Sequence, residues 1–155
     1  MNVTEFKQYL NQSRIAAMKN KNDATKQRAS VLGMLWAQAG ALAKKELREV
    51  SDSDLIQAAR RMIKDLRGNL ELATKADRQD VISSTQVEIL ILEEIVPSQD
   101  NAAIGAHIDA IIADIPAEQR NAKSMGRIIG SVRKTFGNNL DMSEVSNLIK
   151  ERLNA

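Results

Sequence analysis

The acidic side chains and the single histidine are the residues of this 155-residue chain that could do chemistry. Paired carboxylates can bind a metal ion or exchange protons. Three pairs occur: Asp52 with Asp54, Asp77 with Asp80, and Glu93 with Glu94. No further ligand stands at a fitting spacing. We therefore interpret the aspartates as helix N-caps and the glutamates as a solvated helix surface.

His107 lies among isoleucines, and the spacing identifies no catalytic partner for it. We expect a half-buried or surface histidine rather than a base. The chain has no cysteine, which excludes disulfides, thiolate nucleophiles and cysteine-ligated metal clusters. A glycine-rich phosphate loop is also absent. The sequence thus predicts no catalytic residue, no cofactor and no metal.

A basic stretch without any acidic residue lies between Glu118 and Asp141. Its cations are Arg120, Lys123, Arg127, Arg133 and Lys134. Within it, Gly126 and Gly130 share one face of the expected helix. Because glycine costs about 1 kcal/mol in a helix interior, this pair predicts the close approach of another backbone. That backbone is either a neighbouring helix or an RNA strand, and the sequence leaves both open.

These patterns define two candidate RNA-binding surfaces. The first comprises Lys123, Gly126, Arg127, Gly130, Arg133 and Lys134. The secondary one is a ridge of Arg60, Lys64 and Arg67, expected opposite the apolar stripe of its helix. Asp65 interrupts the ridge, which favours an ordinary solvated face. The net charge of +2 is small for a chain that binds a naked phosphate backbone.

Helices must position all of these residues, because apolar side chains recur at intervals of three and four along nearly the whole chain. The pattern predicts four long helices before Pro97. Their expected start signals are Thr4, Asp23, the Ser51–Asp54 cluster and the polar run Asp77–Asp80, and Pro97 is expected to end the fourth. Met34 and Trp36 are expected to fill the core.

Three shorter helices are predicted beyond Pro97, over about 101–114, 124–136 and 142–153. Asp141 with Glu144 forms a plausible capping pair for the last. The segment from Pro97 to Asn101 combines a proline with polar residues and is the best linker candidate. We therefore predict an all-α protein, with a domain of long antiparallel helices over 1–96 and a small three-helix domain over 97–155.

The sequence contains no apolar run near the 18 or so residues that a membrane-spanning helix needs. Its first residues show no basic region followed by an apolar one, as a secretory signal would. We expect a cytoplasmic protein.

Several segments together resemble the GatB/YqeY family. The segment Met125–Leu153 is similar to the family's C-terminal module, with matches at Met125, Gly126, Gly130, Lys134, Val145, Leu148, Ile149, Lys150 and Leu153. Glu88–Pro97 is similar to the family's E-I-x-x-L-E-x-Y-L-P hinge, Arg28 with Val31–Leu35 to R-x-S-V-L-R-M-L, and Arg78–Asp80 to the G-R-x-D turn. The segments follow one another in the family's order along the whole chain.

The chain departs from the family pattern at four places. Gly33 stands where the family often has Arg, Asp77 where it often has Gly, and Ile95 where it often has Tyr. The turn glycine comes one place early, at Gly137, which leaves Asn138 at the usual position. Since asparagine tolerates the left-handed conformation, we expect the turn to survive.

The resemblance implies a two-domain helical fold like the tail of the B subunit of the tRNA-dependent amidotransferase. In that enzyme the tail grips the tRNA elbow, while catalysis, a carbon–nitrogen ligation with glutamine as amido donor, occurs in other domains. Two functions remain open for this chain. One is a non-catalytic module that binds tRNA or another structured RNA beside an amidotransferase or another tRNA enzyme. The other is a helical protein–protein adaptor without RNA contact.

Overall fold

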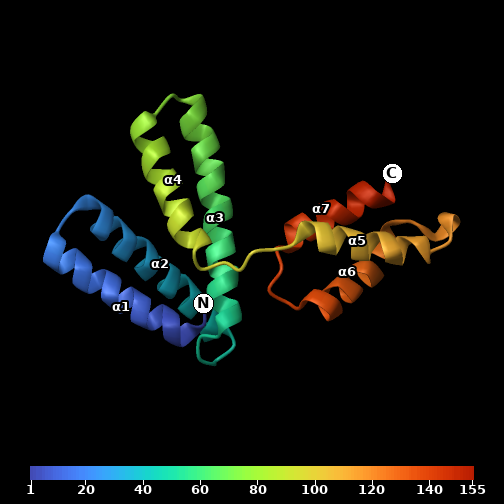
Figure 1. Cartoon of the computed structure of the whole chain (residues 1–155), viewed down its shortest axis with the longest axis horizontal. Helices are drawn as coiled ribbons and strands as arrows, with labels where there is room; N and C mark the ends of the chain where they lie inside the picture. Colours follow the sequence, from blue (N-terminus) through green and yellow to red (C-terminus); the bar gives the residue numbers. More distant parts are fainter. The chain divides into compact units, whose positions relative to one another are not determined.

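The computed structural model describes residues 1–155, and the chain is built from helices without any strand (Figure 1). The all-α prediction is therefore confirmed. The chain divides into two compact units, Met1–Pro97 and Ser98–Ala155. No helix is both long and apolar enough to cross a membrane.

The first unit consists of two helical hairpins (Figure 1). They are formed by α1 (Val3–Asn20) with α2 (Asp23–Lys45) and by α3 (Asp52–Lys75) with α4 (Gln79–Glu93). Helix α2 contacts all three other helices, so it forms the centre of the unit. The largest fully buried side chains are Phe6, Leu32, Leu35, Leu55, Leu92 and Ile95.

Asparagine side chains cap the first two helices of this unit. The Asn2 side chain accepts from the Glu5 N–H at 2.9 Å, and Glu5 accepts from the Asn2 N–H at 3.0 Å. Asn22 caps α2 by accepting from the Thr25 N–H at 2.9 Å. The predicted caps Thr4 and Asp23 are therefore wrong. Both lie inside the first turn, because an asparagine just upstream already satisfies the free N–H groups.

One core prediction for this unit and one predicted helix end need correction. Met34 is 54% exposed, whereas the adjacent Leu35 is fully buried, because one residue along a helix rotates the side chain by about 100°. Trp36 is partly buried and packs against the core as expected, stacked on Phe6 at 6.0 Å. Helix α4 ends at Glu93 rather than at Pro97. The Ile95 N–H bonds to the Leu92 carbonyl there, in a tighter turn.

The second unit packs three α-helices around its own core (Figure 1). These are α5 (Asn101–Ala113), α6 (Ala122–Phe136) and α7 (Met142–Leu153), with the short 3-10 helix η1 (Ala117–Gln119) between the first two. Its fully buried side chains are Ile104, Ile108, Ile128, Val132, Val145 and Ile149.

The turn between α6 and α7 differs from its expected form in two details. Gly137 takes the positive φ of +90°, and Asn138 does not take a left-handed conformation. Asp141 caps α7 by accepting from the N–H groups of Ser143 and Glu144. The Glu144 carboxylate does not reciprocate, because it accepts from the amides of Gln99 and Asn101 instead. The predicted capping pair is thus correct only for its aspartate.

Candidate nucleic-acid interface

Helix α6 presents a basic face to solvent. Lys123, Arg127 and Lys134 are all exposed and recur at intervals of four and seven residues, which places them in one narrow band. Ile128 and Val132 are fully buried and lie on the opposite side of the helix. Burial of that apolar stripe therefore fixes the rotation of α6 and turns the three cations outward. Arg133 is also exposed but lies outside the band, about 100° around the helix from Lys134.

Local bonds determine where this face begins and ends. Asn121 and Ser124 form a capping box at the start of α6, and the Ser124 hydroxyl also donates to the Gln119 carbonyl at 2.6 Å. At the other end the Gly137 N–H bonds to the Arg133 carbonyl at 2.9 Å. The helix therefore includes all six candidate residues between Lys123 and Lys134.

The cations of this face have no acidic partner in the chain. The ion pairs of the second unit include only Arg152 with Asp109, at 2.8 Å. The first turn of α6 contains no acid. Arg120 differs from the others because its guanidinium donates to the Ile115 carbonyl at 2.9 Å and so stabilises the loop before α6. Lys123, Arg127, Arg133 and Lys134 remain available for an external anion.

Gly126 and Gly130 do not lie against another helix. A Cβ atom added at either position would meet no atom within 4 Å. The interpretation that the glycines accommodate a neighbouring helix is therefore wrong, since the core of this unit lies on the other side of α6. Both glycines border the basic band and leave its backbone uncovered.

His107 holds the buried side of α6 against α5. Its Nε2 lies 3.1 Å from the Ser131 Oγ and 3.4 Å from the Thr135 Oγ1. Its ring also meets Phe136 edge-on, with centroids 5.5 Å apart. The expectation of a half-buried histidine is confirmed. Its contacts position α6 and include no carboxylate that could orient a general base.

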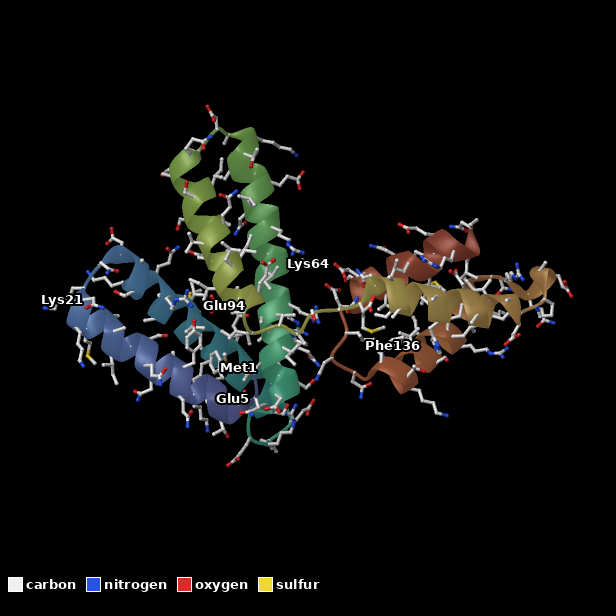
Figure 2. All side chains as sticks on the ribbon, in the orientation of Figure 1. Met1, Glu5, Lys21, Lys64, Glu94 and Phe136 are labelled. Carbon is white, nitrogen blue, oxygen red and sulfur yellow. The ribbon has the colours of Figure 1, made fainter.

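The ridge on α3 offers less free charge than α6. Arg67 forms an ion pair with Glu93 at 3.2 Å. Arg60 is half-buried, and its Nε is shielded from solvent, so it lies beside the apolar stripe rather than opposite it. Lys64, labelled in Figure 2, is exposed and forms no ion pair. The structure brings the three residues onto one side of α3 but not into a free basic surface.

The acidic pairs have structural partners. Ser51 is the N-cap of α3, and Asp54 completes the capping box from the first turn, so Asp54 takes part in capping without being the N-cap. Asp54 also accepts two bonds from Arg48, at 2.5 and 2.9 Å. The Arg48 guanidinium, together with Ser51, holds the pKa of Asp54 far below its ordinary value despite burial. Asp52 accepts from the Val3 N–H at 2.7 Å, which joins α1 to α3.

Glu94 is exposed and also forms a bridge between helices. It lies just after α4 and accepts from Tyr9 on α1 at 2.8 Å and from Arg28 on α2 at 2.9 Å (Figure 2). Arg28 also donates to the Tyr9 hydroxyl. Glu93 pairs with Arg67, and both glutamates are exposed, as the solvated-surface interpretation expects. Helices that are distant in sequence bring these groups together.

The protonation of this bridge follows from its contacts. Burial by itself raises the pKa of Glu94, but the hydrogen bonds from Arg28 and Tyr9 outweigh it and lower that pKa. Burial, together with the bond to Glu94, raises the pKa of Tyr9. The glutamate is therefore held ionised and the tyrosine protonated, which suits a structural clamp. This clamp was not predicted from the sequence, although Arg28 and Glu94 both lie in segments that carry the family resemblance.

Comparison with known proteins identifies one family. The family model described as Yqey-like protein matches residues 7–153, nearly the whole chain. No curated protein matches the sequence. The structure also contains no group of three or more histidine or acidic side chains that could hold a metal ion.

Proposed function

Because the chain belongs to the family of YqeY-like proteins, we propose that it is an accessory module that binds structured RNA, and tRNA in particular, through the basic face of α6. One observation carries the proposal: Lys123, Arg127 and Lys134 share an exposed band and have no acidic partner. A cation that already forms an ion pair with an acidic residue of the chain would have to break that pair before it could bind a phosphate.

The two glycines support the same assignment. Gly126 and Gly130 each lower helix stability by about 1 kcal/mol relative to alanine. No contact within the unit requires their small size. Uncovered backbone beside a row of cations suits a phosphate backbone, which approaches closely and is recognised by shape rather than by base sequence.

The proposed role is non-catalytic. The two carboxylates with the most hydrogen bonds described above, Asp54 and Glu94, are held ionised by arginines, which makes them weak proton acceptors. The resemblance connects the family with glutamine-dependent amidation of tRNA. We therefore place this chain beside an amidotransferase or another tRNA enzyme, where it contributes RNA affinity and the other enzyme performs the chemistry.

The test compares tRNA binding by the intact protein and by Arg127→Glu/Lys134→Glu over a range of salt concentrations. We expect the double variant to bind much more weakly. The slope of log affinity against log salt should also fall by about two, because about two phosphate contacts are lost. Arg127→Gln/Lys134→Gln should show a smaller loss in the same direction. Circular dichroism would verify that α6 stays helical in both.

The matched control is Arg61→Glu/Lys64→Glu, which makes the same charge change at two exposed positions of α3. We expect this variant to retain most of the tRNA affinity. Equal losses in both double variants would mean that binding depends only on net charge. If tRNA does not bind the intact protein below about 0.1 M salt, where phosphate contacts are least screened, the alternative function holds. That alternative is a protein–protein adaptor.

A further inference from the structure

A groove in the first unit lies between the start of α1 and the end of α2. It is open to solvent, has a volume of about 590 Å³, and includes Val3, Trp36, Gly40 and Ala43 in its lining. None of these residues belongs to the basic face of α6. We propose that this groove binds an apolar segment of another protein that carries acidic residues beside its apolar anchors. This inference goes beyond the proposed RNA function and concerns a different surface.

The groove exists because position 40 lacks a side chain. Gly40 lies in the interior of α2, one turn after Trp36 and one turn before Lys44. A Cβ added there would meet no atom within 4 Å, so no packing inside the chain requires glycine. Glycine also makes the helix less stable at this position than alanine would. A side chain of ordinary size would instead project into the groove.

Leu47 supplies an exposed apolar side chain at the rim. Its side chain is 93% exposed, and its backbone is left-handed with a φ of +53°. It follows the end of α2, where its N–H bonds to the Lys44 carbonyl and the Arg48 N–H bonds to the Ala43 carbonyl. Glycine is the usual residue at this position of such a helix end. Leucine is therefore unfavourable here in two ways: its Cβ strains the left-handed backbone, and its apolar side chain is exposed to water. A bound apolar partner would cover that side chain and remove the cost of exposing it.

The charges of the rim indicate an acidic partner. The Lys7 ammonium lies 5.4 Å from the centre of the Trp36 ring, and neither Lys7 nor Lys44 forms an ion pair. The Arg48 guanidinium is occupied by Asp54 and Glu46. Glu49 is the one acid that lines the groove. Lys44, together with Lys7 at the Trp36 ring, complements a segment with apolar anchors and one or two carboxylates.

The surroundings of Trp36 disfavour a nucleic acid in this groove. Phe6 stacks on the indole at 6.0 Å with an interplanar angle of 22°, and Lys7 lies over the ring. The indole is therefore already engaged by an aromatic ring and a cation, whereas a base stacks on a ring face that is free. The edge of the ring and the adjacent Gly40 and Ala43 suit aliphatic side chains.

The experiment selects binding peptides on the immobilised full-length protein from a displayed random library without tryptophan. Trp36 is the only tryptophan in the chain, so the selected peptides can be titrated by its fluorescence. We expect the selected sequences to combine leucine, isoleucine or phenylalanine with Asp or Glu, and binding to shift the Trp36 emission. Basic peptides, or no peptide above background, would overturn the proposal.

The decisive variant is Gly40→Leu, which fills the groove while raising helix propensity. It should weaken peptide binding about tenfold or more and raise the melting temperature. Gly68→Leu is the matched control, because Gly68 lies in the interior of α3 and a Cβ there also meets nothing within 4 Å. It should raise the melting temperature and leave peptide binding unchanged. Equal binding by Gly40→Leu and the unmodified chain would place the peptide elsewhere and contradict the proposal.

Leu47→Gly gives an independent measurement. It should stabilise the fold and weaken peptide binding several-fold, since an apolar anchor is removed. Self-association of the unmodified chain that disappears in Gly40→Leu would overturn the proposal in favour of a second copy as the occupant. Arg127→Glu/Lys134→Glu should bind the peptides normally, so failure of the RNA proposal and failure of this one are separable.

Discussion

Asp77 stands where the family often has glycine, and its backbone conformation shows why glycine suits this position. It follows the end of α3 with a φ of +52°. Its N–H bonds to the Thr74 carbonyl, and the Arg78 N–H bonds to the Ala73 carbonyl. This is the arrangement in which glycine is favoured, because a Cβ disfavours the left-handed conformation. The glycine common at this place in the family therefore has a backbone reason.

At this position we expect Asp77→Gly to stabilise the first unit. The gain in the free energy of unfolding should be about 0.5–1 kcal/mol, somewhat reduced by the loss of the Gln79–Asp77 side-chain bond. Urea denaturation would measure it. Asp77→Asn should be nearly neutral, and Asp77→Val should destabilise, because a β-branched residue tolerates positive φ poorly. Destabilisation by glycine would contradict the assignment of strain.

At the scale of elements, Arg48 and Asp54 join the end of α2 to the start of α3. Asp54 is 3% exposed and accepts bonds from Arg48 and from both the N–H and the hydroxyl of Ser51. Its pKa lies well below the ordinary 3.8. The ionised form therefore stabilises the folded state above about pH 4. That contribution is lost as the pH falls from 3.8 towards the lower pKa of the folded state.

Asp54→Asn should remove this part of the pH dependence. We expect a loss of about 1–3 kcal/mol in the free energy of unfolding at pH 7, and a flatter decline of stability between about pH 5 and 2. Chemical denaturation at a series of pH values measures both. Asp65→Asn, at an exposed position of the same helix, is the control. Parallel pH profiles for Asp54→Asn and the unmodified chain would show that the Arg48 pair contributes little.

At the scale of the whole molecule, the two units have separate hydrophobic cores. One core is made of residues between Phe6 and Ile95, and the other of residues between Ile104 and Ile149. Pro97 and Ser98 between them are exposed. We predict that each unit folds by itself, as domains with their own core do. The second unit, over residues 98–155, is close to the smallest size at which a hydrophobic core stabilises a domain without disulfides or metal ions.

Limited proteolysis should cut first between about 96 and 101, or in the turns near 50 and 77, because these segments are exposed and lie between helices. Fragments 1–97 and 98–155, expressed separately, should each give helical circular dichroism spectra that sum to that of the full chain. The smaller fragment should melt at the lower temperature. A fragment that is unfolded alone would show that the units depend on each other.

The sequence by itself determined the helices, most of their ends and the break near Pro97. These features are local: apolar periodicity, cap residues and proline act on neighbouring backbone within one or two turns. Even the errors at Thr4 and Asp23 amount to one or two residues. The basic band of α6 was predictable for the same reason, because residues four and seven apart share a face of any helix.

Only the tertiary structure decided which faces are covered and which charges pair. Met34 and Leu35 are adjacent apolar residues, yet only the Leu35 side chain is buried against the other helices. Glu94 meets Arg28 across 66 residues of sequence because α2 and α4 pack together. The groove beside Gly40 needs α1 as its second wall. Such contacts depend on how helices rotate and pack against one another, and that is determined by the whole core rather than by any one segment.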